Sequence, residues 1–167
     1  MVERDWTTRA PDPGAALTAD GITIICHGQD GATMVSGDLR AAIAALAPGA
    51  PMLGLGELLP PQPFALRIAR DRALICTDSP LMVSGWQGTF AASYADDLYL
   101  EIRITGPRAP EVVAACLTAP EGSPSTATYF AGISALVAGL PDGVSLRVQT
   151  PDAATLWAHL AKLITVL

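Results

Sequence analysis

The chain is poor in the residue types that most often carry chemistry or positive charge. Its 167 residues include two histidines, three cysteines, a single lysine (Lys162) and no asparagine. Ten Lys and Arg residues stand against sixteen Asp and Glu, which gives a formal net charge of −6, and the ten form no cluster. Nucleic-acid binding depends on clustered basic side chains that neutralise phosphates. We therefore expect a protein with no nucleic-acid partner.

Long apolar runs are also missing. No run approaches the roughly 20 apolar residues that a helix needs to span a bilayer. Residues 1–6 are charged and lack the apolar centre of a signal peptide. Cys26, Cys76 and Cys116 are odd in number and lie far apart, which is typical of buried thiols in a reducing compartment rather than of a disulfide framework. The sequence thus predicts a cytoplasmic protein with no membrane segment.

What the chain does contain is material for a core. Half of its residues are apolar and 16% are charged, a composition typical of a folded globular protein. The length predicts a single domain over residues 1–167. Within it we expect an N-terminal arm or extended edge segment (1–20), then a strand, a helix and a proline-rich connector (21–62), and a main α+β module (63–167).

The first half of the chain predicts short elements separated by loops. A strand over residues 21–26 and a loop over 27–31 precede a helix, which Ser36 or Asp38 caps and which ends at Pro48. The prolines between residues 48 and 63 predict an extended connector. Residues 64–69 and 73–77 predict a hairpin, and Pro80 is expected to begin a short helical turn that reaches Ser84.

The last eighty residues give the clearest order of elements. Strands over 89–94 and 98–105 lead to a helix near Pro110, strands over 126–131 and 133–138, and a hairpin turn at Asp142 before a strand that ends near Val148. Thr150 is expected to cap a final helix whose apolar stripe is Leu156, Leu160, Leu163 and Leu167. The predicted fold class is α+β, a mostly antiparallel sheet with helices packed on one face.

Two neighbouring residues, Cys26 and His27, resemble a nucleophile and its base. Successive side chains of a strand point to opposite faces, so the alternative is a buried cysteine beside a histidine that faces solvent. The loop that follows could bind an anion through backbone N–H groups if Gly28 or Gly31 has an unusual φ, or it is a plain turn.

The remaining polar and aromatic candidates have structural interpretations beside functional ones. Two histidines and no Cys-x-x-Cys pattern fall short of a metal site. Asp96 and Asp97 are typical of a turn, and His159 lies on the polar stripe of the last helix. Trp86 and Trp157 are expected to be packing residues, with the lining of a ligand pocket as the alternative. We assign no catalytic, cofactor-binding or metal-ligating residue and expect no cofactor.

Several short motifs in a fixed order carry a family resemblance. They are residues 70–76 with Trp86, residues 89–94, 98–109 and 112–117, and residues 126–130, 144–148, 151–154 and 156–160. Together they resemble the gamma subunit of heterotetrameric sarcosine oxidase, over roughly residues 55–167. That family shares its fold with the folate-binding aminomethyltransferase, the T-protein of glycine cleavage.

The resemblance implies a non-catalytic, structural subunit of a flavin-dependent sarcosine-oxidising assembly of one-carbon metabolism. In such assemblies flavin, nicotinamide cofactor and folate belong to other subunits, so the expected partners are those subunits or a second copy of this chain. Trp6 or the connector segment 53–59 is the expected contact surface, because both are apolar and lie outside regular elements.

Two alternatives remain beside the subunit hypothesis. One is a stand-alone binder of a folate-like or other carboxylated ligand, for which Arg67, Arg103 and Arg147 are the available strand arginines. The other is an autonomous aminomethyltransferase, which would need a carboxylate positioned near the folate.

Overall fold

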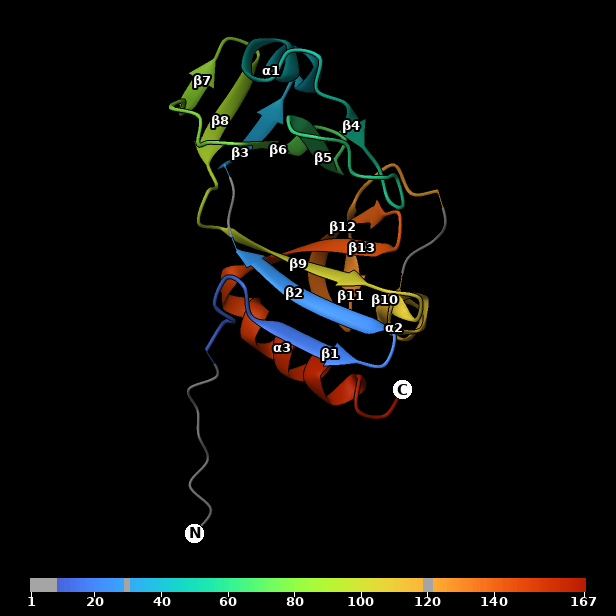
Figure 1. Cartoon of the computed structure of the whole chain (residues 1–167). Helices are drawn as coiled ribbons and strands as arrows, with labels where there is room; N and C mark the ends of the chain where they lie inside the picture. Colours follow the sequence, from blue (N-terminus) through green and yellow to red (C-terminus); the bar gives the residue numbers. More distant parts are fainter. Residues whose placement is uncertain (1–8, 29–30, 119–121) are drawn as a thin grey trace.

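Two β-sheets face one another, and helices cover the outer face of each (Figure 1). The computed structural model describes residues 9–28, 31–118 and 122–167. Three hydrophobic clusters hold the layers together: one between the seven-stranded sheet and two helices, one between the six-stranded sheet and a third helix, and one between the sheets. The α+β class and the mostly antiparallel pairing are confirmed, but two sheets are present where the sequence predicted one.

The seven-stranded sheet combines both ends of the chain. Ile102 and Ile104 point from its centre to the helices α2 (Ala109–Cys116) and α3 (Thr150–Leu163), where they share a buried cluster with Val112 and Leu156. The strand order is β1 (Ala16–Ala19), β2 (Ile22–Gly28), β9 (Tyr99–Thr105), β13 (Gly143–Gln149), β12 (Ile133–Leu140), β11 (Ala127–Phe130) and β10 (Leu117–Thr118).

The six-stranded sheet is built from the chain between β2 and β9. The helix α1 (Leu39–Leu46) covers its outer face, and Asp38 Oδ1 caps this helix by accepting a 3.0 Å hydrogen bond from the Ala41 N–H. The strand order is β4 (Met52–Leu53), β5 (Phe64–Ala69), β6 (Arg72–Thr77), β3 (Gly31–Gly37), β8 (Phe90–Tyr94) and β7 (Gly85–Gln87).

The inner faces of the two sheets share an apolar core. Leu66 and Leu74 from the six-stranded sheet lie in the same buried cluster as Leu136 and Ala138 of β12. Alternate residues of a strand point to opposite faces of its sheet. On β5, β6 and β12, one set of side chains therefore points into this core, and the intervening set points to the helices that cover the outer face of the sheet. This explains why Ala65 and Ile75, at the intervening positions, pack in the cluster with α1.

A close approach of backbones fixes the register between β9 and β13. Gly143 lies opposite Thr105, and an alanine Cβ at position 143 would overlap the carbonyl oxygen of Ile104. Only glycine leaves room for this pairing, because it has no Cβ. The register that follows brings the polar residues of the two strands face to face.

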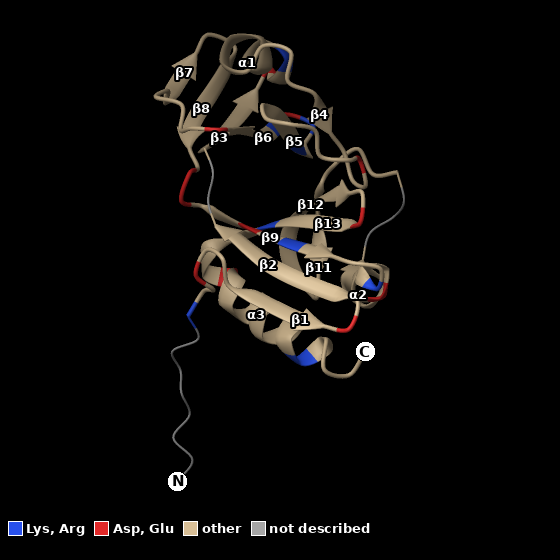
Figure 2. Cartoon of the chain, viewed as in Figure 1, with Lys and Arg blue, Asp and Glu red and all other residues tan. Residues whose placement is uncertain are grey.

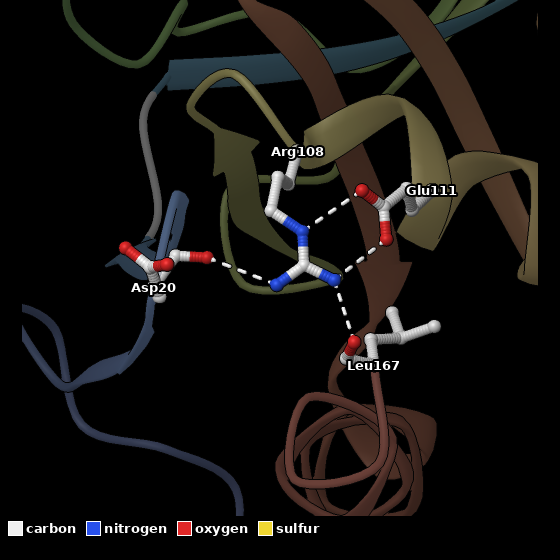
Figure 3. A network of polar contacts seen from close by, with 4 residues as sticks. All are labelled: Asp20, Arg108, Glu111 and Leu167. Atoms are coloured by element: carbon white, nitrogen blue, oxygen red, sulfur yellow. Dashed lines mark hydrogen bonds and ion pairs between the residues drawn. The ribbon is translucent and has the colours of Figure 1, made fainter.

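An arginine at the start of α2 joins three distant parts of the chain (Figure 3). Arg108 donates two hydrogen bonds to the Glu111 carboxylate, at 2.8 and 2.7 Å, and further ones to the backbone carbonyls of Leu167 at 2.6 Å and Asp20 at 3.3 Å. The contact links the turn between β1 and β2 to α2 and to the residues after α3. Four hydrogen bonds of this guanidinium group go to the chain itself, which favours a structural role for the network.

Most elements of the sequence prediction are confirmed. The hairpin of β5 and β6, the strands β8, β9, β11 and β12, and the helices α1, α2 and α3 lie within a few residues of the expected ranges. Asp38, not Ser36, caps α1. The turn expected at Asp142 connects β12 to β13. The division of a single domain into an arm, a connector and a main module stays a prediction.

Four expectations were wrong. Residues 31–37, for which the sequence predicted no strand, form the strand β3 at the centre of the six-stranded sheet, and Ser36 is part of this strand. Residues 80–84 contain no helical turn. The helices do not share one face, since α1 packs on a different sheet from α2 and α3. Thr150 does not cap α3, because its hydroxyl donates instead to the carbonyls of Asp97 and Leu98.

Within the described ranges, no helix combines the length and the apolar character needed to cross a membrane.

Candidate functional site

A cluster of four polar residues lies on the inner face of the seven-stranded sheet. Glu101 and Arg103 come from β9, and Ser145 and Arg147 come from β13. The antiparallel register places Arg147 opposite Glu101 and Ser145 opposite Arg103. The intervening residues, such as Ile102 and Leu146, point to the helices, so the alternation of both strands gathers the polar residues on the side of the second sheet.

The Glu101 carboxylate is the centre of the cluster. Its Oε1 accepts a 2.6 Å hydrogen bond from the Ser145 hydroxyl and a 2.9 Å bond from Arg103 Nε. Arg147 Nη2 lies 3.9 Å from the same oxygen, within ion-pair distance but beyond a hydrogen bond. The side chains of Glu101 and Arg147 are 5% and 7% exposed, whereas that of Arg103 is 39% exposed. The cluster is thus buried at Arg147 and open at Arg103.

The surroundings of Glu101 keep it ionised. Burial by itself raises the pKa of this carboxyl, but the positive charge of Arg147 and the hydrogen bonds from Ser145 and Arg103 outweigh burial and bring the pKa below its ordinary value. The cluster therefore holds two guanidinium groups and one carboxylate. Its net charge at neutral pH is positive.

A cavity of about 450 Å³ opens beside the two arginines. The loop residues 59–62 and Phe64 of β5 form one wall, and Leu140 of β12 completes it. The guanidinium of Arg147 lies over the Phe64 ring, 5.3 Å from its centroid. The structure brings Arg103 and Arg147 together at this cavity. Arg67, the third strand arginine, lines a separate depression with Met52 and Glu57.

A larger groove of about 850 Å³ lies on the outside of the molecule between α2 and the turn from β12 to β13. Pro107, Pro110, Val113, Leu140 and Pro141 make it mainly apolar, and Asp142 is the single charged residue of its lining. No pair of reacting groups meets in this groove. The lining of this groove thus differs from that of the cavity beside Arg103 and Arg147, which carries two cations.

Cys26 and His27 have the positions of the structural interpretation, a buried cysteine beside a histidine that faces solvent. The Cys26 side chain is fully buried and its thiol is 3.7 Å from the carbonyl oxygen of Pro11, whereas His27 is exposed. Burial raises the pKa of the Cys26 thiol, which disfavours a reactive thiolate. All three cysteines are buried and form no disulfide with one another. The pair is not a catalytic dyad.

Residues 29–30 of the proposed anion-binding loop (27–31) lie outside the described residues, whereas residues 27, 28 and 31 belong to β2 and β3. Gly28 has the positive φ that the hypothesis required, +80°. A Cβ at Gly28 would lie 3.0 Å from Pro13, so this glycine also allows the chain before β1 to approach closely.

Asp96, Asp97, His159 and Trp157 have structural positions. Asp96 Oδ1 accepts a 2.8 Å hydrogen bond from the Ala32 N–H, and the turn predicted at Asp96 and Asp97 is present. His159 is exposed on α3, and Trp157 packs against the core of the seven-stranded sheet, as expected. In the part of the chain that the structure describes, no group of three His, Cys, Asp or Glu side chains is placed to hold a metal ion.

Trp86 was wrongly expected to pack in the core. It lies on the edge strand β7 with 76% of its surface exposed, close in sequence to Met82, which is 88% exposed. The expected contact segment 53–59 is partly buried and partly exposed: Leu53 is 6% exposed and Leu55 packs against the seven-stranded sheet, while residues 56–58 are exposed. Its role as a contact surface stays a prediction. Trp6, the other expected contact, lies outside the described residues.

The sequence interpretation missed Glu101, Ser145 and Phe64. One signal was present: the alternation of residues 98–105 and 144–148 places Glu101 and Ser145 on one face of their strands. A strand face with charged residues is ordinarily the face that is exposed to solvent. The second sheet that covers this face could not be inferred from the periodicity of these two strands.

Comparisons with known proteins give a likeness of fold. No protein-family model matches the chain, and no curated protein matches it in sequence. Among solved structures, a chain of the heterotetrameric sarcosine oxidase from Corynebacterium sp. U-96 is similar, with a TM-score of 0.66 and 13% sequence identity. The match covers 95% of this chain and 88% of that chain. This chain therefore has the fold of one chain of a heterotetrameric sarcosine oxidase.

Proposed function

We propose that this chain is a gamma-like, structural subunit of a sarcosine oxidase-type flavoenzyme assembly. The observation that carries the proposal is the extent of the fold likeness. The similar chain belongs to a heterotetramer, and the match spans nearly the full length of both chains. A chain that is only slightly longer than this one, within a multi-subunit enzyme, is a small subunit.

An exposed apolar site at the edge of the six-stranded sheet supports an assembly role. Met82 and Trp86 together form what we call the β7 edge, and both side chains are more than three-quarters exposed. Figure 1 shows β7 at the outer end of its sheet, away from both helices of the other sheet. Large aromatic and methionine side chains are enriched at the centres of protein interfaces, and an exposed edge strand offers unpaired backbone groups. The β7 edge is the proposed contact with a partner subunit.

The charge distribution agrees with a protein partner. Figure 2 shows the basic residues of the described part of the chain as short, separate segments along the ribbon of both sheets. The partner we propose is a flavin-binding chain in the cytoplasm, where the buried thiols stay reduced. The catalytic groups, flavin included, would belong to that partner.

Affinity purification of the tagged chain from its native host tests the proposal. We expect a stoichiometric complex that absorbs near the flavin band and consumes oxygen when sarcosine is added. A complex that contains flavin but does not oxidise sarcosine would keep the subunit role and reject the substrate. Recovery of the chain alone, at any tag position, would contradict the proposal and favour a stand-alone binding protein.

A further inference from the structure

The cavity beside Arg103 and Arg147 has an unbalanced charge. Among the residues that line it, these two arginines are the charged ones, and the rest are Leu59, Pro60, Pro61, Gln62, Phe64 and Leu140. The neighbouring Glu101 carboxylate neutralises one of the two guanidinium groups. One positive charge therefore remains at a cavity whose other lining residues, apart from Gln62, are apolar.

The Arg147 guanidinium also has unused hydrogen-bond donors. An arginine side chain carries five N–H donors. Among the described residues, the contacts of this guanidinium are the 3.9 Å approach to Glu101 Oε1 and the Phe64 ring, neither of which is a hydrogen bond. Glu101 Oε1 already accepts from Ser145 and from Arg103. None of the Arg147 nitrogens is among the fully buried polar atoms that lack a partner in the described residues, so these donors are open to the cavity that Arg147 lines. An acceptor that enters the cavity would form charge-assisted hydrogen bonds with them.

The size and the walls of the cavity narrow the class of ligand. A volume of about 450 Å³ lies in the range of small-molecule sites. The proline and leucine side chains and the Phe64 ring suit an apolar body, and paired guanidinium groups suit a carboxylate, which accepts two parallel hydrogen bonds. A single surplus positive charge, next to the negative Glu101, favours a monoanion over a dianion such as hydrogen phosphate.

We infer that this cavity binds a compact organic monocarboxylate with an apolar body. The carboxylate accepts hydrogen bonds from Arg147 and from the more exposed Arg103, and the body lies between the 59–62 loop and Leu140. The inference rests on the arrangement of the two sheets and does not depend on the proposed subunit role.

Calorimetric titration of the full chain with benzoate tests this site. We expect saturable heat with benzoate and none with benzamide, which has the same ring without the charge. Arg103→Gln should weaken benzoate binding by about tenfold or more, because it removes a charge-assisted hydrogen bond. Arg67→Gln removes an equal charge from the same chain at a separate depression and should leave the affinity unchanged.

The outcomes separate the alternatives. Equal binding of benzamide and benzoate would show an apolar site that does not use the arginines and would overturn the inference. Binding of phosphate in place of benzoate would overturn the assignment to a monocarboxylate. An equal loss of affinity in Arg67→Gln and Arg103→Gln would show a general charge effect and would also contradict it. Because Arg103 lies at the open side of the cluster, Arg103→Gln is expected to fold, and its melting curve checks this.

Discussion

Arg147 of β13 lies directly opposite Glu101 of β9, with 3.9 Å between Nη2 and Oε1, and both side chains are more than nine-tenths buried between the two sheets. A charged pair on an open sheet would be solvated, but here the six-stranded sheet covers it. The pair therefore contributes to the way the two sheets are held against one another, and it provides the cation at the cavity beside the 59–62 loop.

The first prediction concerns Glu101→Gln at neutral pH. Removing the carboxylate leaves Arg147 buried without a counter-charge, and we expect a loss of about 3 kcal/mol in the free energy of unfolding. Urea denaturation followed by circular dichroism measures it. Asp71→Asn, at an exposed turn, serves as the control and should change stability little. Equal stability of both variants would contradict the role assigned to the pair.

The second prediction is the pH dependence of the same variant. The pKa of Glu101 is lower in the folded chain than its ordinary value, so the unfolded state binds the extra proton more readily as the pH falls. The stabilisation is therefore complete above the unfolded pKa of about 4.3 and is lost as the pH drops through the lower folded value. Glu101→Gln should flatten this acid limb in thermal melts between pH 3 and 7, a range set by those pKa values. If the melting temperature of Glu101→Gln fell with pH as steeply as that of the wild-type chain, Glu101 would not be the source of this pH dependence.

Sequence periodicity predicted much of the fold because most strands and helices have one apolar side. The alternation of residues 98–105 identified β9, and the leucine stripe of α3 identified the closing helix. Periodicity did not predict β3, because Gly31, Ala32 and Gly37 have small or no side chains and both faces of this strand are covered, so no alternation of apolar and polar residues is present. Without β3, the sequence did not indicate that a second sheet is present.

The candidate site was predicted only in part. Arg103 and Arg147 were identified as available cations, yet nothing local separates them from Arg67, which lies elsewhere. Their meeting depends on the register of β9 with β13 and on Phe64 from the opposite sheet, a residue remote from both strands in sequence. Such long-range pairing leaves no periodic signal. Trp86 was misjudged because tryptophan is highly buried on average and was expected to pack, whereas β7 is an edge strand.

A third prediction tests the backbone contact that sets this register. Gly143→Ala should cost at least about 3 kcal/mol, because its Cβ would overlap the backbone of Ile104 and force the strands apart. Gly132→Ala is the matched control: position 132 has φ +76° but open space, so it should cost only about 1 kcal/mol. Chemical denaturation compares the two. A smaller loss for Gly143→Ala than for the control would refute the register argument.

The fourth prediction concerns a buried hydroxyl. Thr33 is 1% exposed and its Oγ1 has no hydrogen-bond partner among the described residues. Thr33→Val removes this buried polar atom and should stabilise the chain by about 1 kcal/mol. Thr126 is equally buried, but its hydroxyl donates a 2.8 Å bond to the Arg67 carbonyl, so Thr126→Val should destabilise by a similar amount. Melting temperatures that shift in the same direction for both variants would contradict this account.

The fifth prediction tests the β7 edge as an interface. Trp86→Asp should leave the melting temperature of the isolated chain nearly unchanged, because this side chain is 76% exposed. It should remove most of the flavoprotein that co-purifies with the wild-type chain. Tyr129→Asp, at a residue 61% exposed on the other sheet, should keep the partner. Full recovery of the flavoprotein with Trp86→Asp would exclude this edge as the contact.

The measurement that tests the proposed function most directly is the native mass of the untagged chain in an extract of its host. Size-exclusion chromatography gives this mass, an antibody locates the chain in the fractions, and absorbance locates the flavin. The account predicts that the 17.2 kDa chain elutes at a mass several times its own, in the same fractions as a flavin-containing partner. Elution at the mass of the free chain, in fractions without flavin, would contradict it.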